Sequence, residues 1–137
     1  MPDPYTLLYL KKDGVDGEVE QMEQYMLKSK IHKATLTGTE LDYEGSITID
    51  ENLLEKADIL PGEQVHVLNI NNGERFVTYT IAAPRGSGTV LLNGPAARRG
   101  TVGDKVIILS YCQVPAQKAK DVKVKAIFVD NENKIRE

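Results

Sequence analysis

Apolar and polar residues alternate along most of this chain, and a period of two is typical of β-strands. In residues 26–37 the alternation places Lys30 and His32 on one face and Ile31 on the other. The same pattern recurs between short turns for the rest of the chain. Strands are therefore expected at residues 6–10, 26–37, 46–50, 63–70, 74–83, 89–93 and 104–111, with one more alternating stretch within 121–137.

Two short segments have a different pattern. Asp50 fits the N-cap of a helix whose apolar side includes Leu53 and Leu54, and the Pro-Gly pair at 61–62 ends it. Residues 94–100 form a loop or a second short helix. Seven or so short strands with two helical pieces predict a mainly β protein, folded as a compact β-barrel.

A repeated motif adds detail to this prediction. Residues 60–68 (LPGEQVHVL) and 101–109 (TVGDKVIIL) share the order glycine, acid, any residue, valine, any residue, aliphatic residue, leucine. Each copy opens an expected strand. The match fits a barrel of two interlocked, pseudo-symmetric halves, although chance is an equally open explanation for a nine-residue match.

Composition narrows the class of protein. A chain of 137 residues and 15.2 kDa is the size of one domain, and no apolar run approaches the roughly 20 residues of a membrane span. The N-terminus lacks the pattern of a signal peptide, so a cytoplasmic protein is expected. The net charge of −3 does not indicate a nucleic-acid partner, and neither a nucleic acid nor a membrane is expected as one.

Metal and disulfide chemistry have little support in the sequence. Cys112 is the only cysteine, so no internal disulfide can form. The two histidines, His32 and His66, do not have the spacing of metal ligands. No metal is therefore expected.

Other polar groups could carry chemistry. Alternation puts Arg75 and Tyr79 on one face of their strand and Thr78 on the opposite face. An arginine beside a tyrosine offers a carboxylate-binding fork next to a proton donor, although on its own such a pair is more often a surface arginine packed on a tyrosine. Likewise, Lys30 and His32 form either a solvated face or a site for a small anion.

The Gly45-Ser46 pair stands at the mouth of the strand 46–50 and has two interpretations. It is a turn, or it is a peptide bond that breaks by itself. In the second case the Ser46 hydroxyl attacks the Gly45 carbonyl and forms an ester, helped by a strained glycine conformation and by donors for the oxyanion. Removal of the serine Cα proton expels the Gly45 carboxylate, and hydrolysis of the resulting dehydroalanine releases ammonia and leaves a pyruvoyl group. Such a carbonyl forms a Schiff base with an amine and replaces pyridoxal phosphate.

Several motifs together resemble one family, the pyruvoyl-dependent aspartate 1-decarboxylases. The resemblance runs from Met26 to about residue 133. The motifs are KIH (30–32), LDYEGS (41–46), NGERFVTYTIAAPRGSG (72–88), LNGPAA (92–97) and VGDKVIILSY (102–111).

This resemblance implies a double-psi β-barrel with short helices, assembled as a homotetramer of cleaved α and β chains with active sites between subunits. Cleavage would fall between Gly45 and Ser46, and the covalent pyruvoyl cofactor would derive from Ser46, with no metal and no pyridoxal phosphate. The reaction would convert L-aspartate to β-alanine and CO2 for the synthesis of pantothenate and coenzyme A.

The resemblance also implies roles for individual residues. Ser46 and Tyr79 would be catalytic, with Tyr79 protonating the carbanion left by CO2 loss. Gly45, Ser46 and Thr78 would take part in processing. The substrate-binding residues would be Lys30, His32, Tyr43, Arg75, Thr78, Asn93, Gly94, Pro95 and Ala96.

The chain departs from the family pattern at three places. Leu68 stands where some members have tryptophan, and Pro95, which has no N–H, replaces an alanine in the substrate loop. Residues 1–25 have no counterpart and form an N-terminal extension, either a lineage-specific arm or a stretch upstream of a true start at Met26. The decarboxylase domain is then residues 26–137.

Two other functions stay open at this stage. The barrel could be an unprocessed binding or assembly module that keeps Gly45-Ser46 as a turn. Alternatively, the same chemistry could act on another acidic amino acid, since Leu68 and Pro95 change the pocket. Whether cleavage is spontaneous or needs a helper protein does not follow from residue types.

Overall fold

The computed structural model describes residues 10–11, 19–20 and 22–137. Strands make up about half of the described chain and helices only a small part, so the protein is mainly β, as the alternation predicts. The elements, in chain order, are β1 (Leu10–Lys11), β2 (Val19–Glu20), β3 (Glu23–Thr35), β4 (Gly38–Glu40), β5 (Ser46–Asp50), α1 (Glu51–Lys56), β6 (Gln64–Asn69), β7 (Arg75–Ala83), β8 (Val90–Asn93), η3 (Gly94–Arg99), β9 (Lys105–Pro115), η4 (Ala116–Asp121) and β10 (Lys125–Phe128).

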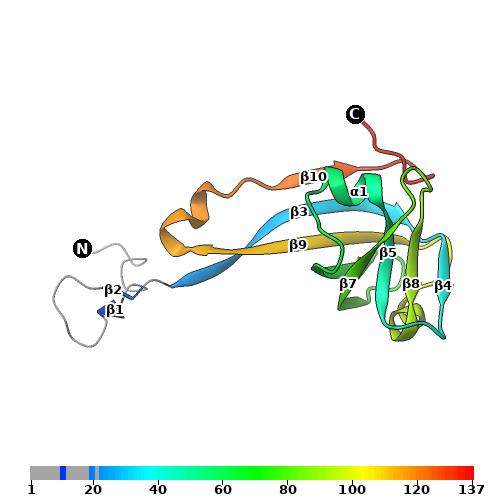
Figure 1. Cartoon of the computed structure of the whole chain (residues 1–137), viewed down its shortest axis with the longest axis horizontal. Helices are drawn as coiled ribbons and strands as arrows, with labels where there is room; N and C mark the ends of the chain where they lie inside the picture. Colours follow the sequence, from blue (N-terminus) through cyan, green and yellow to red (C-terminus); the bar gives the residue numbers. More distant parts are fainter. Residues whose placement is uncertain (1–9, 12–18, 21) are drawn as a thin grey trace.

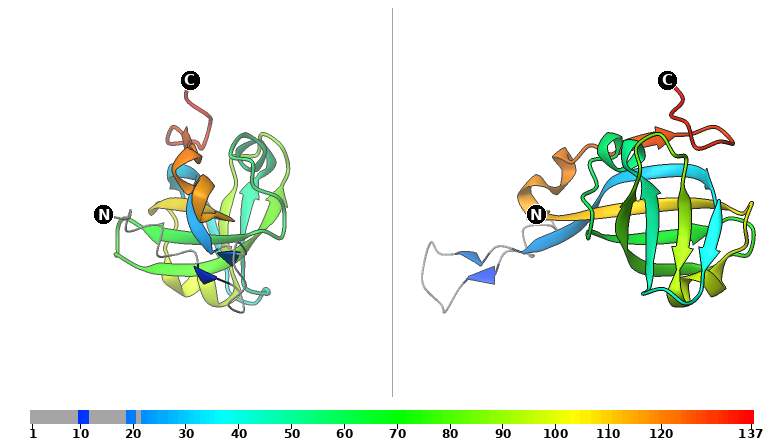
Figure 2. Two further views of the ribbon diagram at one scale, coloured as in Figure 1. Left: turned by 90° about the vertical axis from the view of Figure 1, so that its left-hand side faces the viewer. Right: turned by 45° about the vertical axis from the view of Figure 1, so that its right-hand side comes forward.

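The main sheet closes into a barrel (Figures 1 and 2). Its strands lie in the order β10, β3, β9, β6, β7, β5, β8, β4. Because β3 and β4 are separated only by Leu36 and Thr37, they act as one bent strand that pairs with β9 at one end and β8 at the other. The Thr37 N–H donates to the Val90 carbonyl at 2.8 Å across this seam. The barrel therefore has six strands when β3 and β4 are counted as one. Strand β10 lies outside the barrel and pairs parallel with β3.

The barrel consists of two halves with the same order of elements. In one half, β3/β4 is followed by β5, α1 and β6, and in the other β7 is followed by β8, η3 and β9. Equivalent strands also pair equivalently, since β5 runs parallel to β7 and β8 runs parallel to β4. Strands β6 and β9 pair antiparallel with Val67 opposite Ile108, the same position of the two repeat copies. This pseudo-two-fold arrangement is that of a double-psi β-barrel, the fold that the family resemblance implies.

The repeated glycine has a structural reason in both copies. Gly62 has φ +87° and Gly103 has φ +96°, in the left-handed region that favours glycine. Each glycine N–H donates a hydrogen bond to a backbone carbonyl in the other half of the barrel. Gly62 donates to Thr80 and Gly103 donates to Leu36, both at 2.8 Å.

The repeated acid has one as well. Glu63 accepts from the Leu60 N–H at 3.1 Å and Asp104 from the Thr101 N–H at 2.9 Å, so each carboxylate caps its own turn. Each also accepts from the neighbouring strand: Glu63 from the Ser110 hydroxyl, and Asp104 from the Asn69 amide. The repeat in the sequence is therefore a repeat of contacts.

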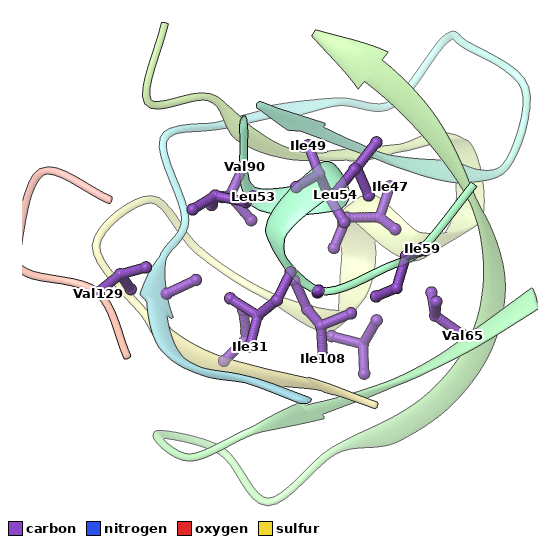
Figure 3. Close-up of a cluster of buried hydrophobic side chains, with 14 of the residues drawn as sticks. Ile31, Ile47, Ile49, Leu53, Leu54, Ile59, Val65, Val90, Ile108 and Val129 are labelled. Carbon is purple, nitrogen blue, oxygen red and sulfur yellow. The ribbon is translucent and has the colours of Figure 1, made fainter. Parts of the chain in front are cut away.

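The core fills the barrel and lies under α1 (Figure 3). Asp50 caps α1 as predicted, accepting from the Asn52 N–H at 2.8 Å. Six residues are too few for a stable isolated helix, and α1 depends on burying Leu53 and Leu54, each worth about 1.5–3 kcal/mol. The largest fully buried side chains include Ile31, Ile47, Ile49, Leu92, Val65, Val67, Val90 and Ile108.

Strands β3 and β9 are longer than predicted. They pair from Glu23 opposite Pro115 inward, and this ribbon extends beyond the barrel with η4 at its tip (Figure 1). The alternation did not indicate β4 or η4, which are short. The strand predicted at 6–10 lies outside the described residues except for Leu10, which begins β1. No helix in the described part of the chain has the length and apolar character to span a bilayer.

Candidate active site

Ser46 is the first residue of β5, and its hydroxyl is fully buried and held in place. The residue is 0% exposed and lies opposite Asn93 of β8. Its Oγ accepts a hydrogen bond from Asn93 Nδ2 at 2.9 Å and donates to the Glu44 carbonyl at 3.3 Å. The same Asn93 amide also donates to Thr48 Oγ1 at 2.7 Å. The hydroxyl beside the Gly45 carbonyl is thus oriented by a buried amide that is anchored at a second point.

The turn before Ser46 packs tightly against Gly94, the first residue of η3. Gly94 has φ +60°, and a Cβ there would come within 2.4 Å of the Tyr43 carbonyl oxygen and 2.7 Å of the Gly45 nitrogen. No side chain fits this position without moving the turn.

The strain expected at Gly45 is therefore located elsewhere. Gly45 is not among the positive-φ glycines of the described chain, so the prediction of a glycine-only conformation there is wrong. A Cβ on Gly45 would lie 3.4 Å from Pro95 Cδ, so lack of space is what disfavours a side chain. The left-handed glycine of this junction is Gly94, because β8 must turn sharply into η3 where the 43–45 turn crosses it.

A pocket of about 410 Å³ opens beside the junction. It is lined by Gly45, Phe76, Val77, Thr78, Tyr79, Pro95, Ala96 and Arg99. The structure thus brings together five of the residues predicted for the site. Ser46 and Gly94 adjoin Gly45, and Asn93 is bonded to Ser46.

Thr78 and Tyr79 both reach this pocket although they point to opposite faces of β7. The reason is the pairing of the strand. Strand β5 pairs with β7 only from Thr80 onward, so the β5-side edge of β7 is unpaired before Thr80. Residues from both faces can line a pocket at such an open edge, which explains why alternation alone excluded Thr78.

Arg75 shares the outer face of β7 with Tyr79, as predicted, but it does not line the pocket. Its Nη2 donates to the Tyr111 hydroxyl at 3.2 Å, so the side chain extends across β6 toward β9.

Lys30 and His32 are also remote from the pocket within one chain. Lys30 lies opposite Leu109, Leu109 opposite His66, and His66 opposite Val77. Three strand spacings, about 14 Å, therefore separate Lys30 from β7 on the same outer face.

The charge of the Lys30/His32 pair resides on the lysine. Burial, with Lys30 and Lys33 nearby, lowers the pKa of His32 below its ordinary value, so His32 is neutral at pH 7. Its ring packs edge-on against Phe128 with centroids 5.5 Å apart. Burial and the two lysines therefore disfavour the charged form of His32 in the single chain.

The remaining predicted residue, Tyr43, is 54% exposed and does not line the pocket. What it brings to the junction is its backbone carbonyl, against Gly94. Arg99 does line the pocket and was missed. The sequence shows an arginine in the GPAARRG segment. Whether its side chain faces the pocket depends on the path of η3, which the sequence pattern does not give.

Two further features of the described chain bear on other kinds of site. A larger pocket of about 560 Å³, lined by Tyr25, Glu63, Gln64, His66, Tyr111, Cys112 and Gln113, contains none of the predicted site residues. Residues 10–11, 19–20 and 22–137 contain no group of three or more histidine, cysteine or acidic side chains placed to hold a metal ion.

Comparison with known proteins gives a consistent result. The family model described as aspartate decarboxylase matches residues 22–136, so the match begins four residues before the predicted domain boundary. The aspartate 1-decarboxylase of Thermoanaerobacter pseudethanolicus is 58% identical over 113 residues, covering 82% of this chain and 97% of the relative. That of Syntrophus aciditrophicus is 56% identical over 115 residues, covering 84% and 99%. The crystal structure of the rationally designed protein mkDPBB_sym_86 has a TM-score of 0.44 at 20% identity, covering 56% of this chain and 90% of the designed one.

Proposed function

Since this chain belongs to the aspartate decarboxylase family, we propose that it converts L-aspartate to β-alanine and CO2 with a pyruvoyl group made from its own Ser46. The observation that carries this proposal is the buried Ser46 hydroxyl, held by Asn93 beside Gly45, at a pocket that also contains Tyr79. β-Alanine is a precursor of pantothenate and coenzyme A, a role that fits the predicted cytoplasmic location.

Self-cleavage begins with the contacts of Ser46. The Asn93 amide fixes the hydroxyl next to the Gly45 carbonyl, which Ser46 Oγ attacks to form an ester. Loss of the Ser46 Cα proton then breaks the ester and frees the Gly45 carboxylate. Water adds to the dehydroalanine that remains and ammonia leaves, so atoms balance with one water consumed. Thr78, at the same pocket, assists processing.

The residues around Ser46 fit a pyruvoyl group. Ser46 is fully enclosed, and Asn93 Nδ2 is a donor already aimed at the oxygen-bearing side chain. When formed, the group supplies an electron-withdrawing carbonyl that takes up the substrate amine. Gly94, Pro95 and Ala96 pack close to the junction and exclude bulk water from one side.

Tyr79 is the proton donor in this proposal. It lines the pocket that contains Gly45, and it is 37% exposed, so its hydroxyl can reach a substrate held there. After CO2 leaves, the substrate Cα needs a proton, and a phenol placed beside it provides one.

The site of a single chain is incomplete, which supports a homotetramer with sites between subunits. Lys30, His32 and Arg75 have the character of carboxylate and substrate partners, yet they lie away from the pocket on the outer sheet face. That face also exposes apolar surface, with Val77 at 52%. A neighbouring subunit that covers it would bring these residues to the pocket of its partner.

A second candidate function keeps the chemistry and changes the acidic amino acid. Pro95 lines the pocket directly, whereas Leu68 lies between Arg75 and Ile107 on the outer face. Leu68 therefore bears on substrate choice only through a neighbouring subunit. Side-by-side assays with L-aspartate and L-glutamate separate these two functions, and a chain that stays uncleaved and inert is the binding module instead.

The Tyr79→Phe variant tests the assignment of the proton donor. We expect complete cleavage at Gly45-Ser46, with kcat for L-aspartate lowered about a hundredfold or more, because general acid catalysis contributes about 10²–10⁴ in rate. Cleavage is followed by denatured mass and turnover by β-alanine formation. Full activity in this variant would show that another group or water supplies the proton.

A further inference from the structure

Among the residues that the structure describes, Arg99 is the one charged side chain lining the pocket beside Gly45. The other lining residues are apolar or uncharged: Gly45, Phe76, Val77, Thr78, Tyr79, Pro95 and Ala96. Arg99 also lines a neighbouring pocket of about 570 Å³ with Leu41, Glu74, Pro95 and Arg98, so it stands on the wall between the two. Among these lining residues, Arg99 is therefore the group that can attract an anion.

The position of Arg99 is fixed by the turn between β6 and β7. Its backbone carbonyl accepts from Asn69 Nδ2 at 3.1 Å and from Asn72 Nδ2 at 2.9 Å. Its Nη1 donates to the carboxylate of Glu74, which follows the same turn. Three side chains of one short segment therefore hold both ends of the residue.

Most of the hydrogen-bonding capacity of Arg99 is unused. A guanidinium has five N–H donors, and among the described residues only Nη1 has a partner. The side chain is 50% exposed, so the free donors are accessible from the pocket. Its planar fork suits a carboxylate, which it can bind through two parallel hydrogen bonds.

We propose that Arg99 binds the side-chain carboxylate of the acidic substrate, the carboxylate that the reaction leaves unchanged, and that Glu74 limits the strength of this contact. The inference rests on the proposed decarboxylase function. The carboxylate lost as CO2 is a poor partner for a strong cation, because that contact would stabilise the charge that must disappear. A contact with the unreacting carboxylate is equal in the ground state and the transition state, so it acts on KM and not on kcat.

The test compares charge removal at Arg99 with the same change one residue away. Arg99→Gln is expected to raise KM for L-aspartate about tenfold, with kcat within twofold and cleavage complete. The inhibition constant of succinate, a dicarboxylate without an amino group, rises by a similar factor. Arg98→Gln lowers the chain charge equally but changes a residue outside the catalytic pocket, and its KM stays within twofold.

Two further variants show whether the effect comes from carboxylate binding or from structure. Arg99→Lys keeps the charge and loses the fork, so KM rises by less than in Arg99→Gln. Glu74→Gln removes the competing carboxylate, so KM falls below the wild-type value. A loss of packing alone would not produce these opposite signs.

Three outcomes would overturn the inference. One is an unchanged KM and succinate inhibition constant in Arg99→Gln. Another is a fall in kcat at constant KM. The third is an uncleaved Arg99→Gln chain, which would assign the residue to processing. Failure of the proposed function looks different, because then the wild-type chain itself forms no β-alanine.

Discussion

Asp50 and Asn93 occupy equivalent positions in the two halves of the barrel, but their side chains make different contacts. Asp50 ends β5 and begins α1, and Asn93 ends β8 and begins η3. The Asp50 carboxylate accepts from the backbone N–H groups of Asn52, Gly86 and Gly88 at 2.8–3.0 Å. Asn93 makes no side-chain capping bond to its own helix. Its amide donates instead to Ser46 and Thr48 of the neighbouring strand β5.

The comparison separates stability from chemistry at one repeated position. In the first half, the polar residue after the strand caps a regular α-helix and ties the 86–88 loop to it. In the second half, the equivalent residue leaves its helix uncapped, and that helix is a 3₁₀ segment that starts with a left-handed Gly94. Only Asp50 caps its helix, and Asn93 instead holds the hydroxyl of Ser46, the proposed nucleophile.

Gly94→Ala is expected to have the largest effect on cleavage. The added methyl would overlap the Tyr43 carbonyl and the Gly45 nitrogen, so the junction must move away from Asn93. We expect no cleaved chain, by denatured mass, over a time in which the wild type is fully cleaved.

Gly73→Ala is the matched control for that change. Gly73 also has a positive φ, +76°, but a Cβ there meets nothing within 4 Å. The Gly73→Ala variant bears only the cost of an alanine in the left-handed region, about 1–2 kcal/mol, and its chain should cleave normally. Cleavage of Gly94→Ala at the wild-type rate would contradict the assigned role of the tight contact.

Asn93→Ala comes next, because it removes the donor to Ser46 without displacing the turn. We expect cleavage at least tenfold slower, since one oriented donor at a reacting group is worth about 10²–10³ in other active sites. Thr48→Val removes the second partner of Asn93 but keeps the bond to Ser46, and it should cleave within fivefold of wild type. Equal rates of cleavage in wild type and Asn93→Ala would contradict the proposed role of Asn93, and with it the difference between the two halves.

Asp50→Ala should affect stability and leave the chemistry intact. Three hydrogen bonds to a buried carboxylate are lost, which we expect to lower the free energy of unfolding by about 2–4 kcal/mol at pH 7. The measurement is urea unfolding of Asp50→Ala against its parent, both carrying Ser46→Ala so that the chains stay intact, at one protein concentration. If Asp50→Ala slows cleavage in a chain that keeps Ser46, then Asp50 takes part in the chemistry as well.

The pH dependence of that difference follows from the pKa of Asp50. Burial alone would raise this pKa, but the N–H groups of Gly88, Asn52 and Gly86, with Lys134, outweigh it and lower the pKa below its ordinary value. A carboxyl whose pKa is lower in the folded state stabilises the fold above its unfolded pKa, about 4, and loses that contribution as the pH falls through the folded value. The stability gap between the two proteins should therefore shrink from pH 7 to pH 3. A gap that stays constant over this range would contradict the assigned role of the three N–H donors.

The sequence predicts the barrel well because period-two alternation follows directly from the pleat of a strand. The repeat could be found because the glycine and the acid each have a local role in their turn. Its extension to Asn69 and Ser110, at the same spacing of 41 residues, became visible only once the acids were seen to bond across β6 and β9.

The candidate site is less accessible from sequence. Ser46, Tyr79 and the 93–96 segment are brought together as the family motifs imply, and the composition of the pocket adds Arg99. The separation of Lys30, His32 and Arg75 from this pocket depends on the order of strands in the sheet, which alternation does not encode. The position of the left-handed glycine, at Gly94 and not at Gly45, depends on where two turns cross.

The denatured mass of the freshly purified protein shows directly whether the chain cleaves itself between Gly45 and Ser46. We expect two chains, one ending at Gly45 and one beginning at the position of Ser46 and lighter by one ammonia than simple hydrolysis would leave it. A single intact chain that persists on prolonged warming, alone and with a cell extract as a source of a helper protein, would contradict self-cleavage and reduce Gly45-Ser46 to a turn.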